Sequence, residues 1–236
     1  MSAKTLSLAL AVPLVAASLG AAFAVPAAAQ TCNVTGKAQC ANTTMNWQVK
    51  AHDNLKGSNF KGAKLKGADF RNANLTKANF KGAVLTSADF RNANLTKVNF
   101  SGAKLKYANF TGATMTKAQL TKAKSSNANF TGVSLQKSKL KNGNFENSNF
   151  YGADLTGANL AGSNQVPPPP PFGPQTKAKV TTDLTNANLY GATLSGANLK
   201  NVNLDNAMMG GVFAFGTNFT QANLYGSTLN GALLEG

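Results

Sequence analysis

The residues that could carry out chemistry are few in this chain of 236 residues. It contains one histidine, His52, two cysteines, Cys32 and Cys40, and eight acidic residues. No nucleophile is placed beside a base, no pair of carboxylates suited to acid–base catalysis shares a predicted face, and no glycine-rich loop is placed to hold a phosphate. One histidine and two cysteines are too few for a four-ligand structural zinc site. The sequence therefore predicts no enzyme activity, no metal, no cofactor and no small-molecule substrate, with His52 as a surface or cap residue.

Basic side chains are the abundant charged group. Lysine and arginine number 23 against eight acidic residues, which gives a formal net charge of +15. From Asp53 to Gln165 there are 17 basic and 5 acidic residues, whereas from Leu184 onward Lys200 is the only basic residue. Positive charge concentrated in one region of the chain favours acidic partners for that region.

A repeated segment must position these side chains. Lys61 to Phe80 reads KGAKLKGADFRNANLTKANF, and Lys81 to Phe100 matches it at sixteen of twenty positions. Leu or Phe falls on every fifth residue, and a small residue, usually Ala, stands two places earlier. A period of five fits neither the helical 3.6 nor the strand period of 2.0. The pattern predicts a coil that turns one corner every five residues and stacks each residue on the residue twenty places later.

The apolar centres of the repeat support this square coil, because their identity follows the twenty-residue spacing. They form four columns, two of which are aromatic over the first coils. The aromatic columns are Phe70, Phe90, Phe110, Phe130 and Phe150 and, opposite them, Phe60, Phe80 and Phe100. Each Leu or Phe buried along the axis would contribute about 1.5–3 kcal/mol to stability. The columns therefore predict one continuous core.

The motif A(D/N)LxX gives the chain a family resemblance. It is seen in Ala73-Asn74-Leu75, Ala68-Asp69-Phe70, Ala153-Asp154-Leu155 and Ala158-Asn159-Leu160, and it resembles the repeat of the pentapeptide-repeat proteins, over most of residues 53–236. The resemblance implies an all-β fold, a right-handed quadrilateral parallel β-helix solenoid. Some members of the family mimic DNA and bind topoisomerases in the cytoplasm through an acidic surface. This basic chain does not match that role.

The first residues, 1–29, are typical of a signal peptide. Lys4 precedes a long apolar run, and Ala27-Ala28-Ala29 offers a small-residue cleavage site before Gln30. The run is also long enough to span a bilayer, so an uncleaved anchor is the alternative. Cleavage predicts an exported protein, either periplasmic or extracellular or in an equivalent lumen, that keeps no integral membrane segment.

Residues 30–52 depart from the repeat and are predicted to form an N-terminal cap. A solenoid needs such a cap because an exposed strand edge invites pairing with another chain. Cys32 and Cys40 lie in this segment, and in an oxidising compartment they most simply form one disulfide. A redox site would require the closer C-x-x-C spacing.

The remaining chain divides into two arrays joined by a loop. The first array covers residues 53–165, and the loop, residues 166–180, contains five consecutive prolines that cannot donate to a β-ladder. The second array covers residues 181–236 and resumes the five-residue period one residue out of phase. We expect it to stack on the first array, since fewer than three coils would be marginal alone. Its last coil has no polar cap, which suggests a homodimer through the C-terminal coil.

Outward-facing basic residues also form columns at the twenty-residue spacing. The candidate residues for binding an acidic polymer are Lys77, Lys97, Lys117 and Lys137 in one column, Arg71 and Arg91 in a second, and Lys64, Lys104 and Lys124 in a third. Stacked lysines repel one another unless a polyanion neutralises them. The alternative is that they are only solvated and keep the rod soluble. Asp69 and Asp89 are placed to neutralise part of the arginine column.

A second candidate surface lies in the second array. Ala214 is small for a centre, and Phe213 and Phe215 flank it at nominally outward positions, with Met208 and Tyr190 sharing the preceding wall. Either a phenylalanine folds inward to fill the space, which we favour, or these four side chains form an exposed patch for a protein partner.

Two functions follow from the sequence. The first is a non-enzymatic, exported scaffold for structural or protein–protein interactions with an unknown protein partner. The alternative is binding of an extracellular or periplasmic polyanion, such as an acidic polysaccharide, lipopolysaccharide or nucleic acid, through the stacked lysines. Nearly all phenylalanines are inward centres, so the sequence offers no stacking platform for bases.

Overall fold

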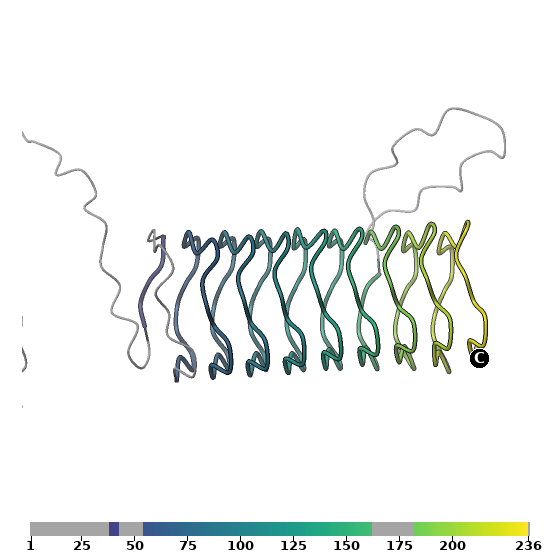
Figure 1. The fold of residues 1–236 in the computed structure, drawn as a ribbon, viewed down its shortest axis with the longest axis horizontal. Helices are drawn as coiled ribbons and strands as arrows, with labels where there is room; N and C mark the ends of the chain where they lie inside the picture. The colour runs from purple at the N-terminus through teal and green to yellow at the C-terminus, as the bar shows by residue number, and fades with distance from the viewer. Residues whose placement is uncertain (1–37, 43–53, 162–181, 236) are drawn as a thin grey trace, which may run out of the picture.

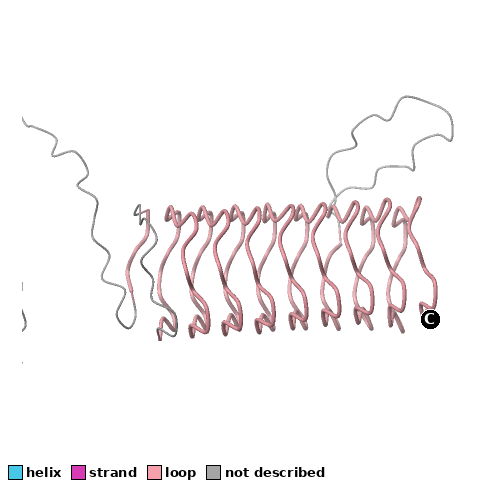
Figure 2. Ribbon diagram, viewed as in Figure 1, coloured by secondary structure: helices cyan, strands magenta, loops and turns pink. Residues whose placement is uncertain are grey.

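A computed structural model describes residues 38–42, 54–161 and 182–235 of the chain. These residues wind into a single straight stack of coils, with the N-terminal coils at one end and the C-terminal coils at the other (Figure 1). The described residues contain no helix and no continuous strand, and Figure 2 accordingly draws them all as loops and turns. Each side of a coil instead contributes one residue to a parallel β-bridge. No helix in the described ranges is long and apolar enough to cross a membrane.

The register of the stack is twenty residues, as the sequence predicts. Asn74 forms parallel bridges with Asn54 on one side and Asn94 on the other. The amide N–H of Leu75 donates to the carbonyl of Asn94 at 2.8 Å, and the N–H of Asn94 donates to the carbonyl of Ala73 at 2.9 Å. The same pair of bonds repeats on every side of the inner coils, so the backbone polar groups are satisfied between coils.

One side of a coil shows why the repeat has its composition. In Ala73-Asn74-Leu75-Thr76-Lys77, the side chains of Ala73 and Leu75 are buried, and the Oδ1 of Asn74 accepts the backbone N–H of Thr76 at 3.2 Å. Such a side-chain bond stabilises a turn, which explains Asn or Asp before each centre. The N–H of Ala78 donates to the carbonyl of Leu75 and closes the corner, and the third turn residue, Lys77, takes a φ of 61°.

We number the four sides of the stack by one centre each. Face 1 is the side centred on Leu75, face 2 on Phe80, face 3 on Leu85 and face 4 on Phe90, each with the residues stacked on it. The corner between two faces is formed by the two residues after a centre, and the second of these takes positive φ throughout the described coils, as Gly or Asn at most corners. The left-handed conformation is the reason, since it suits these two residue types best.

The core is a ladder of phenylalanine rings from faces 2 and 4. Along face 4, Phe70 and Phe90 stack with centroids 4.9 Å apart and planes 4° apart. Across the shaft, Phe80 of face 2 meets Phe90 edge to face at 5.9 Å. Both arrangements are the favoured geometries of aromatic pairs. The two opposite aromatic walls predicted from the sequence are therefore confirmed, and they meet in the middle of the shaft.

The second array continues the first without a break. Bridge partners across the insertion, such as Asn149 with Asn188 and Asn159 with Asn198, are thirty-nine residues apart and not twenty. The insertion therefore adds nineteen residues between face 2 and face 3 while the stack stays in register. The expected stacking of the two arrays is found, and the proline-rich segment lies outside the described residues.

Residues 38–42, which the sequence places in the cap, also adopt the repeat geometry. Gln39 forms a parallel bridge with Asn59, the side chains of Ala38 and Cys40 are buried, and Asn42 has a φ of 58°. Ala-Gln-Cys-Ala-Asn is thus one more side of face 2, with Cys40 in the place of a centre. Cysteine behaves as a small apolar residue when buried, so it fits this position.

One centre in the core breaks the pattern. Ser125 is fully buried on face 3, and its Oγ has no hydrogen-bond partner. The next centre on this face is Phe145, and a Cβ at Gly143 would collide with the Phe145 ring. The small Ser125 is thus followed, one coil later, by the large Phe145, whose ring needs the glycine at position 143. At the far end of the stack, the last four centres, Phe219, Leu224, Leu229 and Leu234, are only partly buried or exposed.

Candidate polyanion-binding surface

The lysines of the first array gather on two adjoining faces. Faces 2 and 3, together with the corners before, between and after them, carry fifteen exposed lysines and one acidic residue, Glu146. The fifteen are Lys56, Lys61, Lys64, Lys66, Lys77, Lys81, Lys97, Lys104, Lys106, Lys117, Lys122, Lys124, Lys137, Lys139 and Lys141. No ion pair joins any of them to an acidic residue within the described coils. This side of the rod is therefore strongly cationic, and we call it the lysine side.

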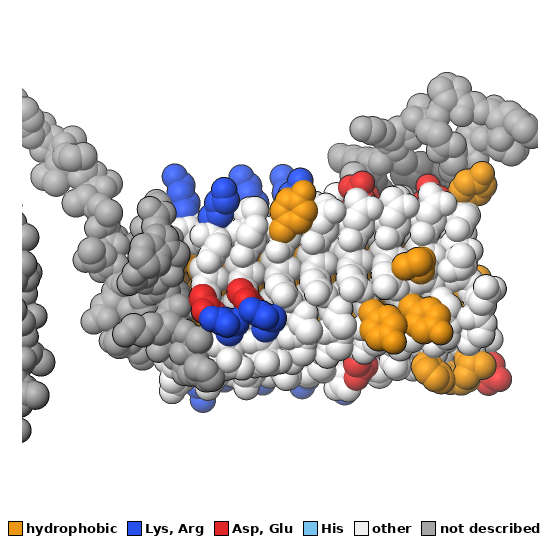
Figure 3. Space-filling view, viewed as in Figure 1, with side chains coloured by type: hydrophobic (Ala, Val, Ile, Leu, Met, Phe, Trp, Pro, Cys, Tyr) orange, Lys and Arg blue, Asp and Glu red, His pale blue; other side chains and the backbone are white. Residues whose placement is uncertain are grey.

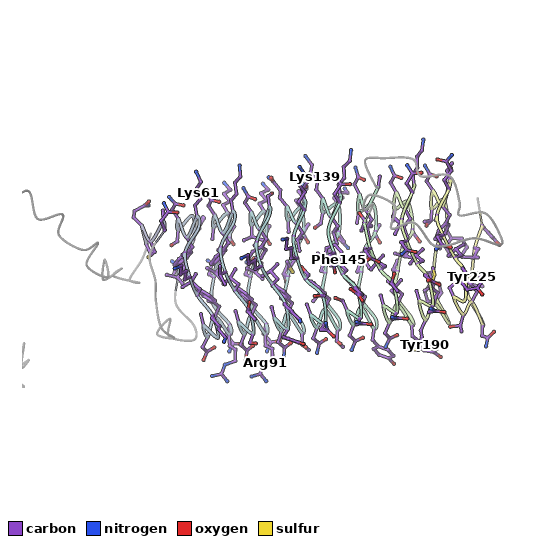
Figure 4. The ribbon with its side chains drawn as sticks, turned by 90° about the horizontal axis from the view of Figure 1, so that it is seen from above. Lys61, Arg91, Lys139, Phe145, Tyr190 and Tyr225 are labelled. Carbon is purple, nitrogen blue, oxygen red and sulfur yellow. The ribbon has the colours of Figure 1, made fainter. Side chains whose placement is uncertain are left out.

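The opposite side of the same coils is nearly balanced in charge, and we call it the balanced side. Between residues 54 and 161, faces 1 and 4 and the corner between them carry two basic residues, Arg71 and Arg91, and three acidic ones, Asp69, Asp89 and Asp154. Figure 4 shows Lys61 and Lys139 projecting from one edge of the rod and Arg91 from the other. The charge in the sequence is thus separated in space around the rod.

The arginine column is already neutralised, as the sequence suggests. Arg71 donates to Asp69 at 2.6 Å and 2.9 Å, and Arg91 donates to Asp89 at 2.7 Å. The side-chain hydrogen bonds that Arg71 donates to Asp69 lower the pKa of Asp69 and raise the pKa of Arg71. Figure 3 shows red and blue side chains in contact on this face. These two arginines are therefore weaker candidates for binding a polyanion than the unpaired lysines.

Asp154, the third acidic residue on this side, has no basic partner among the described residues. Burial alone would raise its pKa, but hydrogen bonds from Thr156 and Gln136 stabilise the charged carboxylate and lower the pKa overall. The carboxylate thus stays ionised and gives the balanced side its remaining negative charge.

The column Lys77, Lys97, Lys117 and Lys137 occupies corners with positive φ. The φ angles of the four residues lie between 55° and 61°, and the neighbouring corners of the column are Gly57 and Gly157. A residue with a Cβ costs about 1–2 kcal/mol in this conformation. The column is exposed and straight, as predicted, but it is separate from the Lys64, Lys104 and Lys124 column, which lies in the bridge row of face 3.

The amide side chains on the lysine side present donors to solvent. On face 2, Asn79 and Asn99 each use the Oδ1 atom to accept a backbone N–H, from Lys81 at 3.1 Å and from Ser101 at 3.0 Å. On face 3, Asn144 does the same with the N–H of Glu146. With the acceptor used in the corner, the remaining polar atom is the NH₂ donor, of which Asn79 uses one N–H on the Oδ1 of Asn59 at 3.3 Å and keeps the other. Cations and amide donors together favour a partner rich in acceptors.

A groove lies on the lysine side, across face 3. Its volume is about 630 Å³, and four lysines line it, Lys104, Lys106, Lys122 and Lys124. Lys104 and Lys124 are β-bridge partners on adjacent coils, so their side chains project next to each other. The sequence identified these two but missed Lys106 and Lys122. Neither shares their column, since Lys122 lies in the corner that leads into face 3 and Lys106 in the corner that leads out of it.

The apolar candidate patch lies on the balanced side of the second array. Phe213 and Phe215 remain outside the core with 45% and 41% of their surface exposed, so the inward distortion favoured by the sequence is wrong. The buried Ala214 keeps its place in the bridge ladder through its N–H bond to the carbonyl of Leu233. Met208 is also half exposed, and hydrophobic side chains gather toward this end of the rod in Figure 3.

Tyr151 extends this patch across the insertion. Its ring stacks on that of Tyr190 with centroids 5.8 Å apart and planes 6° apart, and both rings are half exposed. A Cβ at Gly210, the next position of the column, would lie 2.9 Å from the Tyr190 ring, so glycine leaves room for it. The sequence missed Tyr151 because the two tyrosines share a column only once the nineteen-residue insertion is known.

The remaining candidates concern the N-terminal segment. No cysteine among the described residues is a free thiol, and Cys40 is fully buried. Cys32, His52 and the signal segment lie outside the described residues, so the predicted disulfide and cleavage site stay predictions. No group of three His, Cys, Asp or Glu side chains able to hold a metal occurs in the described ranges.

Comparison with known proteins places the chain in a family. A family model for pentapeptide repeats matches in eight copies, over residues 54–92, 93–124, 128–164, 182–221 and 199–236. No curated protein shows a significant match.

Solved structures with the same repeat are also similar. HetL, a pentapeptide repeat protein involved in heterocyst differentiation regulation from the cyanobacterium Nostoc sp. Strain PCC 7120, is 24% identical over 77% of this chain and 76% of its own, with a TM-score of 0.41. A pentapeptide repeat protein from the Arabidopsis thaliana thylakoid lumen is 37% identical over 46% of this chain and 65% of its own, with a TM-score of 0.30.

QnrB1, a plasmid-mediated fluoroquinolone resistance protein, is 18% identical over 79% of this chain and 89% of its own, with a TM-score of 0.56. This likeness shows a shared fold, the right-handed β-helix. Because the family model covers more than half of the sequence, the protein belongs to the pentapeptide repeat family.

Proposed function

We propose that the protein is an exported, non-enzymatic scaffold that presents the faces of a rigid β-helix to macromolecular partners. The observation that carries the proposal is the separation of buried and exposed positions within each repeat. The centres and the small residues are buried in the core, while the outward residues form straight columns along the rod. Columns of this kind suit the recognition of an extended partner better than the enclosure of a small substrate.

Export is supported by the N-terminal sequence and by the cysteines. The segment before Gln30 is typical of a cleaved signal peptide, and a disulfide between Cys32 and Cys40 would tie the first coil to the cap in an oxidising compartment. Expression of the full chain, followed by mass spectrometry of the exported fraction, tests both points. We expect a mature protein beginning at Gln30 whose mass is lower by two hydrogens before reduction. A chain found only with its signal segment and with two free thiols would contradict the proposal.

Binding of an acidic polymer is the second candidate function. The separation of charge favours it, since fifteen lysines without an ion pair among the described residues share one side, while the arginines on the other side are paired with aspartates. Lysines needed only for solubility could be placed on any face. A cationic side also attracts a polyanion at long range, and salt weakens that attraction.

Retention on immobilised heparin as a function of salt tests this second function. We expect the protein to elute well above physiological salt, with an affinity that falls linearly on a logarithmic salt scale. Replacing Arg71 and Arg91 by Gln serves as a control on the balanced side and is expected to leave elution nearly unchanged. Elution at low salt would leave the scaffold function alone. The predicted homodimer is tested separately, by sedimentation of the purified chain.

A further inference from the structure

The groove on the lysine side has the features of a binding site for an anionic group. Four lysines line one opening, and none has a carboxylate partner among the described residues. Ser126 and Asn144 add a hydroxyl and an amide to the lining. The Oδ1 of Asn144 already accepts the N–H of Glu146, so its NH₂ group is the part left to face a ligand. Four like charges around one cavity repel one another unless an anion occupies it.

The groove coincides with the defect in the core. Ser125 lies between Lys124 and Ser126, which both line the groove, and it is the serine that replaces a large centre. In the corner that leads from face 3 into face 4, the bond from the N–H of Tyr107 to the carbonyl of Ser126 is 3.3 Å, whereas the equivalent bonds of the neighbouring coils are 2.9 Å. The other bonds that join these two coils on face 3 are 2.8 and 2.9 Å long, so only this corner bond is lengthened. The site is therefore local, not a feature that every coil repeats.

The exposed tyrosine that follows the groove residue Lys106 is not available for base stacking. Tyr107 is half exposed, but the Nζ of Lys106 lies over its ring, 4.8 Å from the centroid. Proteins that bind single-stranded nucleic acid stack bases on free aromatic faces. The groove also contains no arginine, the residue that pairs bidentately with phosphate. Lysine ammoniums beside hydroxyl and amide donors suit isolated carboxylates or sulfates and the hydroxyls between them.

We propose that this groove binds an acidic polysaccharide, with the carboxylate or sulfate groups of the sugar chain held by Lys104, Lys106, Lys122 and Lys124. The proposal deepens the second candidate function and rests on it. The polymer runs from the groove along the lysine side, where the amides of face 2 donate to sugar hydroxyls.

Two variants with equal loss of charge test the site. In the groove variant, Lys104, Lys106, Lys122 and Lys124 are each replaced by Gln. In the matched control, Lys77, Lys97, Lys117 and Lys137 are each replaced by Gln, which removes the same charge from the corner between faces 1 and 2. Glutamine is accepted at positive φ in this fold, since Gln221 has a φ of 57°. Equal urea midpoints for both variants and the parent show that the coils are intact.

Binding of the full chain to heparin, polygalacturonate and single-stranded oligothymidylate is measured by titration at several salt concentrations. We expect the parent to bind the two polysaccharides. The groove variant should lose affinity by about tenfold or more, and the slope of its log affinity against log salt should be smaller by up to about 3. The control should lose affinity by less than about threefold.

Three outcomes would overturn the proposal. Equal losses in the two variants would mean that only total charge matters, which leaves polyanion binding intact but removes the site. Binding to oligothymidylate with none to the polysaccharides would replace the polysaccharide with nucleic acid. No binding by the parent to any of the three polymers would remove the second function together with the site.

Discussion

Replacement of Phe90 by leucine probes the interaction that holds the first array together. Phe90 stacks between Phe70 and Phe110 at 4.9 and 5.0 Å and meets Phe80 and Phe100 edge to face at 5.9 and 5.5 Å. Leucine preserves an apolar centre but loses the ring contacts. The two stacked pairs are worth about 1–3 kcal/mol beyond burial, and the smaller side chain leaves a void that costs about 0.5–1 kcal/mol. We expect the free energy of unfolding to fall by about 1.5–4 kcal/mol.

Equilibrium urea unfolding followed by circular dichroism measures this loss, with the m-value as the check that the same surface is exposed. The matched control is Leu95→Met, a swap of similar volume in a column that already contains Met115. It should cost less than about 1.5 kcal/mol. If Phe90→Leu cost no more than this control at an unchanged m-value, ring stacking would not be what stabilises the shaft.

Three further predictions concern a corner, the ion pairs and the core defect. Gly82→Ala should lower the free energy of unfolding by about 1 kcal/mol through its φ of 68° alone, because nothing lies within 4 Å of the new Cβ. Gly82→Asn should lower it less, because asparagine tolerates positive φ better, and equal urea midpoints for the two variants would contradict this. The pKa of Asp69 is lowered by its hydrogen bonds with Arg71, so its stabilisation is complete above the unfolded pKa of about 4 and disappears as pH falls through the lower folded value. Asp69→Asn should therefore reduce the fall in stability measured between pH 5 and acid, and an unchanged pH profile would refute the role of the pair. Ser125→Ala should raise the free energy of unfolding by about 1 kcal/mol, because it removes a buried hydroxyl that has no hydrogen-bond partner. Ser148→Ala should lower it by about as much, because it removes a 2.8 Å bond to the carbonyl of Ser125. Thermal melts in which Ser148→Ala is the more stable variant would contradict this account.

The sequence was sufficient for the architecture because the repeat is nearly regular. Once centres are twenty residues apart, Phe70 must stack on Phe90, and the outward columns follow from the same arithmetic. The neutralisation of Arg71 by Asp69 could also be predicted, since the two residues flank one centre and project from the same face.

The groove could not be predicted, because Lys106 and Lys122 belong to other columns than Lys104 and Lys124 and reach the groove from the two corners that flank face 3. Lys122 ends one side of the coil and Lys124 lies on the next, and folding the sequence into columns separates them. The pairing of Tyr151 with Tyr190 also needed the length of the insertion, which the five-residue period leaves open.

The outward position of Phe213 was mispredicted for another reason. Ala214 suggested a void that a neighbour would fill, but Phe213 is the bridge residue between Thr193 and Leu233. Turning Phe213 inward would break its β-bridges to these two residues. The bridges therefore keep the side chain outside, although Ala214 leaves the core less filled. The repeat geometry of residues 38–42 was missed because Cys40 and Gln39 differ from the usual residue types at their positions.

The claim on which the account depends is that residues lie side by side at the coil spacing, even across the insertion. An engineered disulfide tests it most directly, since bridge partners are close enough for the bond and residues on different faces are not. In the pair Asn149→Cys and Asn188→Cys, thirty-nine residues apart and bridged on face 4, oxidation should link the two peptides, as peptide mass mapping would show. In the control pair Asn149→Cys and Asn198→Cys, on opposite faces, no such link should form. Absence of the first link, or formation of both with equal ease, would contradict the stacked β-helix and the lysine side built on it.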